Sequence, residues 1–224
     1  MEPRYKSLVV SLVPQSREIP PPAFAAEDLQ RIFADVTRSY PYQAFEFLFG
    51  GRGAQFTAGP EDSVELRPAL LQVRAQMDGM DVLTAPMAEE KALRILKIAS
   101  ERLEIERFVQ CQIAIVALVE APGPEPDAKA FVAEKMMHDG DQAAELGPGY
   151  VGAGVQFKSS PSDGVGEEML SVEPFFQSND LVFLSHQITR VPANEPPFSL
   201  DQTSAWIAGA FDFLSGPTMR LLNR

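Results

Sequence analysis

The chain has 224 residues, and its 45% of apolar and 22% of charged residues are typical of a globular domain and exclude a fibrous or disordered class. Its net charge of −12 at pH 7 would repel a polyphosphate backbone, so we expect no nucleic-acid partner. The apolar runs are too short to cross a bilayer, and we expect no membrane association. Because Cys111 is the only cysteine, an intrachain disulfide and a thiolate zinc cluster are excluded, which is typical of a cytoplasmic protein.

The first elements follow from apolar periodicity and from proline. A dense run of Leu and Val at residues 5–13 predicts a strand, which Pro14 closes. Apolar residues at spacings of three and four predict a helix over residues 26–40, ended by Pro41. Aromatic and polar residues then alternate over residues 42–56, which we interpret as a strand with a bulge or tight bend at its glycines.

A hairpin and a long helix are expected next. Residues 64–77 predict a second strand that pairs with the one before it, with Pro68 at an edge or a bulge. Thr84 is a candidate cap for a helix that runs from about residue 86 to residue 108.

The same order of elements then begins again. Residues 109–119 predict a strand dense in Ile and Val, residues 127–138 a helix, and residues 150–158 another strand. Residues 169–188 predict one strand or a hairpin turned at residues 178–180.

A repeated sequence segment, called the repeated phrase below, supports the interpretation that the order of elements occurs twice. Residues 51–64 and 152–165 align without a gap and share seven of fourteen residues, at a separation of 101 positions (152 − 51). A period of that length indicates duplication of half a domain rather than a solenoid. We therefore expect an α+β fold built from two β-α-β-β-α units, residues 1–107 and 108–224, with antiparallel strands, helices on one face and a pseudo-twofold axis.

The last helix is a candidate interface. It is predicted from a capping box at Ser199 and Gln202 to Leu214, and Gly216 and Pro217 are expected to break it. Its apolar residues cover well over half its circumference, so part of it either contacts another subunit or is wedged between the two halves. The candidate interface residues are Trp206, Ile207, Phe211 and Phe213.

A cleft between the halves is the alternative site. Aromatic residues would line it, and a carboxylate on a strand near the axis could bind a cationic ligand or act as a base. The candidate ligand-binding residues are Tyr42, Phe45, Tyr150, Glu173 and Phe175.

Catalytic chemistry has little support. His138, Asp139 and Asp141 could hold a divalent metal, but Asp and Gly after a helix are also ordinary turn residues. The only other histidine is His186, so a histidine-rich hydrolase site cannot be assembled. Cys111 lies in a predicted strand without a nucleophile turn. We expect no cofactor and lean against an enzyme.

Several short motifs resemble those of a known family. They are the strand at residues 66–73, the strand at residues 108–116, the helix at residues 206–222 and the Tyr40-Pro41 turn. Together they are similar to a sporadically distributed bacterial family of uncharacterised proteins of this size, although an arginine-rich strand expected in mid-chain is reduced to Arg107. The family has no activity to transfer. The order of elements also resembles duplicated bacterial effector-binding domains, which implies a ligand between the halves.

The leading hypothesis is a cytoplasmic, non-catalytic protein that binds another protein or copies of itself. A small-ligand receptor is the alternative, and a carboxylate-dependent hydrolase comes third.

Overall fold

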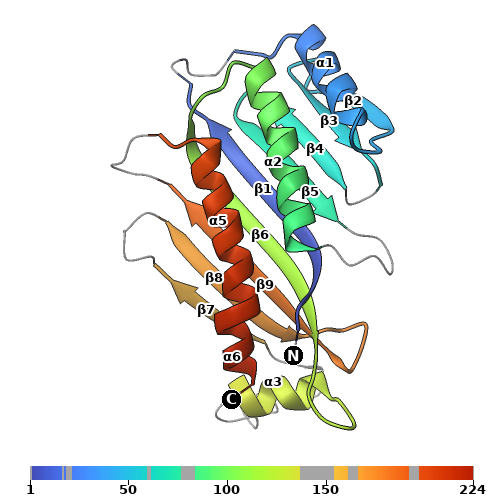
Figure 1. The fold of residues 1–224 in the computed structure, drawn as a ribbon, viewed down its shortest axis with the longest axis vertical. Helices are drawn as coiled ribbons and strands as arrows, with labels where there is room; N and C mark the ends of the chain where they lie inside the picture. The colour runs from blue at the N-terminus through green and yellow to red at the C-terminus, as the bar shows by residue number, and fades with distance from the viewer. Residues whose placement is uncertain are drawn as a thin grey trace.

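The computed structural model describes residues 2–16, 18, 22–59, 62–76, 84–136, 154–160, 166–191 and 197–223 (Figure 1). The strands are β1 Arg4–Pro14, β2 Ala44–Leu48, β3 Gly53–Thr57, β4 Ser63–Arg67, β5 Leu70–Gln76, β6 Phe108–Glu120, β7 Val155–Ser159, β8 Glu167–Pro174 and β9 Leu181–Arg190. The helices are α1 Ala26–Thr37, α2 Ala85–Arg102, α3 Ala128–Met136, α5 Leu200–Phe213, the π-helical turn η1 Leu214–Thr218, and α6 Met219–Leu222.

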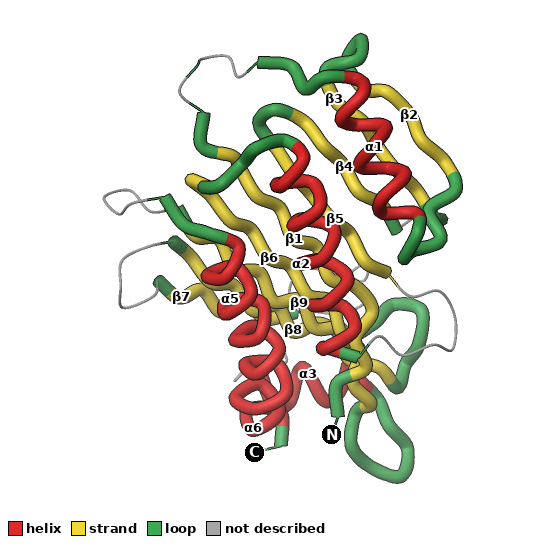
Figure 2. Tube along the Cα trace, turned by 45° about the horizontal axis from the view of Figure 1, so that its top comes forward, coloured by secondary structure: helices red, strands yellow, loops and turns green. Residues whose placement is uncertain are grey.

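The described strands form one antiparallel sheet in the order β2-β3-β4-β5-β1-β6-β9-β8-β7. Helices α1, α2 and α5 lie side by side on one face of it, and α3 lies across one end (Figures 1 and 2). The expected α+β class is confirmed. None of the helices that the structure describes is both long and apolar enough to span a bilayer.

The two expected halves meet in the middle of this sheet. Strand β1 pairs with β6 over almost its whole length, with Val10 opposite Ile113 and Leu12 opposite Cys111. Beyond β1 come β5, β4 and β3, and beyond β6 come β9, β8 and β7. Because the halves share a continuous hydrogen-bonded ladder, no cleft separates them along this line.

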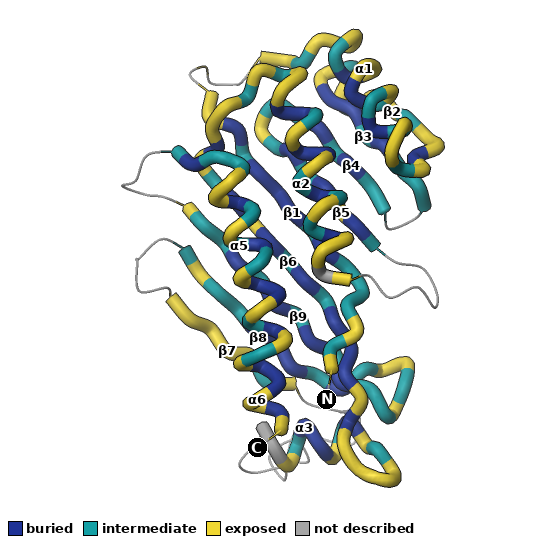
Figure 3. Tube along the Cα trace, viewed as in Figure 1, coloured by how far each residue is buried: buried dark blue, intermediate teal, exposed yellow. Residues whose placement is uncertain are grey.

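The core lies between the sheet and the helices. In the inner strands, such as β4, β5 and β9, alternate residues are buried, as expected from the two-residue period of a strand, and β1 contributes Leu8, Val10 and Leu12 to the core. Helix α2 packs on these strand residues through Ile95, Leu96 and the buried helical positions next to them. In Figure 3 the central strands are largely buried, whereas β7 is largely exposed.

The prediction for residues 42–77 was wrong in the number of strands, because this segment folds into β2, β3, β4 and β5. The first expected strand turns back at Phe49, Gly50 and Gly51, which all have positive φ values of 52°, 68° and 88°. The second is divided at Pro68, which sits in a two-residue connection between Arg67 and its pairing partner Leu70. Proline pre-sets the φ that such a turn requires.

The prediction that Gly216 and Pro217 end the last helix was also wrong. The chain continues through η1 into α6, and Pro217 lies inside the π-helical turn. A proline removes one main-chain donor and crowds the preceding turn, and the wider π-helical turn accommodates it without ending the helix.

Two local predictions were confirmed. The Thr84 hydroxyl accepts a hydrogen bond from the Met87 N–H at 3.4 Å at the start of α2. The segment 169–188 is a hairpin of β8 and β9, as one of its two readings expected.

Candidate functional site

The outer strand β7 is the most exposed regular element of the second half. It pairs with β8 on one side only, and among the strands that the structure describes none pairs with its other edge. From Gln156 to Ser159 every residue is exposed. An unpaired edge presents main-chain N–H and C=O groups that can pair with another strand.

The side chain at the centre of β7 differs from its counterpart in the repeated phrase. Phe56 of β3 and Phe157 of β7 are 101 positions apart, and both strands lie third from the central pair. Phe56 is 0% exposed, whereas Phe157 is 41% exposed. The same residue at the same place in the sheet order is therefore covered in one half and open in the other.

Two neighbours account for the burial of Phe56. The ring of Phe45, its cross-strand partner on β2, lies 5.6 Å away at 22°. Phe33 of α1 covers it from above, with the ring centroids 5.2 Å apart. Among the described residues of the second half, nothing equivalent to β2 lies beside β7, and α3 contacts β8 and β9 instead.

Inward from Phe157 the sheet is buried. Leu170 of β8 is its register partner, and His186 of β9 is the partner of Leu170. The His186 ring stacks on Phe213 of α5 at 4.5 Å. The exposed Phe157 side chain therefore lies in one row with Leu170 and His186, which leads into the core under α5. We call the surface formed by Phe157 and Leu170 the outer shelf.

A polar group lies beside the outer shelf. Arg190 donates through Nη2 to Oε1 of Glu168 at 2.6 Å, and the Arg190 side chain is 11% exposed. Its Nε and Nη1, and both ring nitrogens of His186, have no hydrogen-bond partner among the residues that the structure describes. The Ala210 main chain comes close to the imidazole without reaching hydrogen-bond geometry.

Burial determines the protonation states of His186 and of the neighbouring Cys111. Desolvation lowers the pKa of His186, and the nearby Glu168 carboxylate opposes that shift only in part, so the ring is neutral at pH 7. Burial raises the pKa of the neighbouring Cys111 thiol to about 12, although Arg190 pulls it down. A thiol held in its neutral form is a poor nucleophile, so Cys111 is suited to packing.

The face of β7 and β8 opposite to Phe157 and Leu170 is polar. The Gln156 amide donates to the Ser171 hydroxyl at 3.2 Å, and Lys158 forms an ion pair with Glu167 at 2.9 Å. Thus β7 has an apolar face, a polar face and one edge with which no strand of the described residues pairs. Such a strand can add one more strand to the sheet.

The sheet has two arms: β5, β4, β3 and β2 lie beyond β1, and β9, β8 and β7 lie beyond β6. The predicted ligand-binding residues are divided between these two arms. Tyr42 is buried and donates to Oδ1 of Asp62 at 2.8 Å, and Phe45 of β2 packs on Phe56. Glu173 lies on β8 and Phe175 just after it, on the other side of the central pair. Tyr150 lies outside the described residues. The described members therefore do not converge on one cleft.

The predicted interface residues mostly take part in internal packing. Ile207 and Phe211 are buried, and Phe213 stacks on His186. Trp206 is half-buried and packs edge-on against Phe198 at 4.9 Å. Helix α5 contacts both the sheet and α2. The alternative in which the helix is wedged inside the molecule therefore explains why these side chains are apolar.

The predicted metal ligands His138, Asp139 and Asp141 lie outside the described residues. Within the described part of the chain, no group of three or more His, Cys, Asp or Glu side chains is arranged to hold a metal ion.

Phe157 was not among the candidate site residues predicted from the sequence. A signal was present just before the phrase. The first copy follows Phe45, Phe47 and Phe49, whereas the positions 101 residues later hold Leu146, Pro148 and Tyr150. Leu146 therefore stands where the first copy has Phe45, the phenylalanine that packs on Phe56.

Comparison with known proteins adds no name to this site: no protein-family model and no curated protein sequence matches the chain at a significant level.

Proposed function

We propose that this chain is a non-catalytic binding protein that accepts an extended strand of a partner protein at the outer edge of β7, with which none of the described strands pairs. The contrast between Phe56 and Phe157 carries the proposal. The proposal also takes the two halves to be a duplication whose second copy uses the partner strand where the first copy uses β2. The lone, buried Cys111 supports a cytoplasmic setting.

The pairing of β2 with β3 supplies the template for the partner strand. In that pair Phe45 faces Phe56, Glu46 faces Gln55 and Phe47 faces Ala54. A strand that bound β7 in the same way would place an apolar ring over Phe157 and a polar residue opposite Gln156. The partner segment is therefore extended, with aromatic or aliphatic residues at every second position.

The expected affinity is modest. Full burial of a phenylalanine contributes about 1.5–3 kcal/mol, and Phe157 is already more than half covered. Each main-chain hydrogen bond adds about 0.5–1.5 kcal/mol net, from which the cost of ordering the partner is subtracted. Dissociation constants in the micromolar to millimolar range follow, which suit reversible recognition.

A peptide with the sequence of residues 42–50 tests the proposal, because its pairing mode on β3 is known. Labelled with a fluorophore, it should bind the intact protein saturably in an anisotropy titration. The Phe157→Ser variant should bind at least about ten-fold more weakly, and a scrambled peptide should not bind. Phe49→Ser is the matched control, because Phe49 is 64% exposed in a turn of the other arm.

Two results would overturn the proposal: no saturable binding, or equal weakening by Phe157→Ser and Phe49→Ser, which indicates general hydrophobic adhesion. Measuring the mass of the unmodified protein in solution identifies the source of the partner strand. A dimer that dissociates on Phe157→Ser makes the partner a second copy of this chain, and a monomer makes it another protein.

A further inference from the structure

A second feature lies in the other half, between α1 and α2. A surface hollow of about 480 Å³ opens there, far along the sheet order from β7. The polar side chains that line it are Asp35, Arg38, Ser39, Arg94, Glu101 and Arg102.

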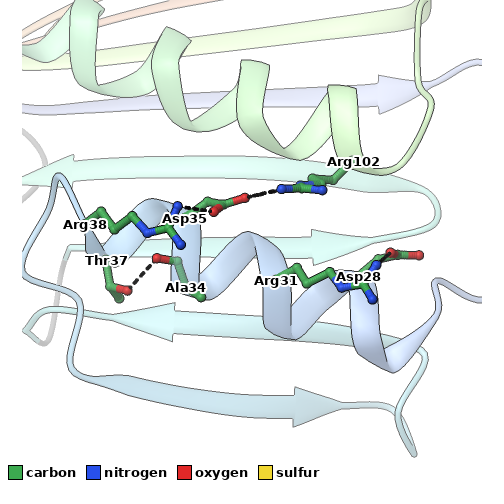
Figure 4. A network of polar contacts seen from close by, with 7 residues as sticks. All are labelled: Asp28, Arg31, Ala34, Asp35, Thr37, Arg38 and Arg102. Carbon is green, nitrogen blue, oxygen red and sulfur yellow. Dashed lines mark hydrogen bonds and ion pairs between the residues drawn. The ribbon is translucent and has the colours of Figure 1, made fainter.

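One carboxylate holds two of the arginines in place. Asp35 accepts from Arg38 Nη1 at 3.0 Å through one oxygen, and from Arg102 Nε and Nη2 at 3.2 and 2.9 Å through the other (Figure 4). Arg38 comes from the end of α1 and Arg102 from the end of α2. The shared carboxylate therefore orients both guanidinium groups in the lining of the hollow, and some of their N–H groups have no partner within the described part of the chain.

The third arginine, Arg94, lies close to the hydroxyl of Tyr40. Arg94 is exposed on α2, and it forms no ion pair within the described part of the chain. Glu101, the second carboxylate of the hollow, lies 3.9 Å from Lys97. The lining therefore holds three cations against two anions, one of which is shared with a lysine, on a chain whose net charge is −12.

We propose that this hollow binds a phosphoryl group. Three guanidinium groups approach from two helices, and the Ser39 hydroxyl adds a neutral donor. A ligand with three terminal oxygens can use donors from several directions at once, which a carboxylate with two oxygens does less well. The phosphoryl group comes either from a small phosphorylated molecule or from a phosphorylated residue of another protein.

Calorimetric titrations at low ionic strength test the site, because salt screens exposed charges. The probes are inorganic phosphate, a phosphoserine peptide and its unphosphorylated form, with acetate for comparison. Phosphate should bind saturably and more tightly than acetate. A phosphoserine peptide that binds more tightly than phosphate points to a protein source, and the reverse order points to a small molecule.

Paired charge variants separate a site from general electrostatics. Arg94→Gln should weaken phosphate binding by about two- to five-fold, and Glu101→Gln should strengthen it by a similar factor. Arg31→Gln and Glu27→Gln are the matched controls, because they make the same charge changes in an exposed pair on α1. Unchanged affinity in the controls supports the site. Equal effects in both pairs, or no saturable binding of phosphate to the unmodified protein, would overturn it.

Discussion

The imidazole of His186 stacks on the phenyl ring of Phe213, with the ring centroids 4.5 Å apart and 27° between the ring planes. The ring is 1% exposed, and the charged groups that influence it are Glu168 on β8 and Arg190 on its own strand. Burial lowers the pKa of His186 because the charged ring would lose its hydration, so the packing of α5 on this ring depends on the pH of the solution.

Acidification should destabilise the protein through His186. Because the pKa of His186 is lowered in the folded state, the unfolded chain binds the proton first as the pH falls. The free energy of unfolding should therefore fall from just above pH 6.5 down to the folded-state pKa and then level off. Urea denaturation at several pH values should show this slope in the unmodified protein and a smaller slope in His186→Phe. Identical slopes in both proteins would contradict the prediction.

The two copies of the repeated phrase should respond differently to the same change. A Cβ added at Gly53 would overlap the main-chain oxygen of Leu66, whereas one added at Gly154 would meet the side chain of Glu173. Backbone cannot move aside cheaply, but a side chain can rotate. Gly53→Ala should cost about 2–3 kcal/mol of stability and Gly154→Ala less than about 1 kcal/mol, measured by chemical denaturation. A larger cost at Gly154 would show that the arm around β7 is the more rigid one.

Asp62 should be important for stability. Its carboxylate accepts from the Tyr42 hydroxyl and from the Lys91 ammonium, and the Asp62 and Lys91 side chains are largely buried. Burial and the neighbouring carboxylate raise the pKa of Tyr42, so its phenol remains a donor. Asp62→Ala leaves both donors without this acceptor and should cost about 2–4 kcal/mol in thermal or urea unfolding.

Asp28→Ala is the control for that change, because Asp28 pairs with Arg31 at 3.9 Å on the exposed surface of α1. It should cost less than about 0.5 kcal/mol. Equal losses in the two variants would mean that the buried pair contributes no more than a surface one.

Gly209 offers a stabilising substitution. It lies in the interior of α5, where a Cβ would meet no atom within 4 Å. Gly209→Ala should raise the free energy of unfolding by about 0.5–1 kcal/mol, because alanine loses less backbone entropy in a helix. Ala205→Gly, at an exposed position of the same helix, should lower it by a similar amount. An unchanged or lower free energy of unfolding in Gly209→Ala would contradict the prediction.

Local periodicity predicted the fold class and most element positions. The Leu and Val run of β1 and the spacing of Leu29, Ile32 and Val36 in α1 are signals carried by neighbours in the chain. Strand number in residues 42–77 was harder, because a two-residue turn at Pro68 leaves the alternation of apolar residues almost unbroken.

The candidate site could not be predicted from local pattern. Phe56 and Phe157 stand in nearly the same sequence context, and what distinguishes them is whether another segment lies on top. Likewise, the cleft expected between the halves requires a gap that the β1 and β6 ladder closes, and strand order across a sheet is not encoded in periodicity. The hollow between α1 and α2 joins Arg38 to Arg102 across 64 positions (102 − 38), a contact that only folding creates.

The place of β1 in the sheet affects how the chain folds during synthesis. It precedes the other described strands in the chain, and it lies at the centre of the sheet, paired with β5 on one side and with β6 on the other. Residues 70–76 can complete its first edge early, but its second edge must wait for residues 108–120. Until then a strand rich in Leu and Val has an open side, and pairing over so long a separation is slow. A nascent chain arrested before residue 108 should therefore be far more prone to aggregation than the finished protein.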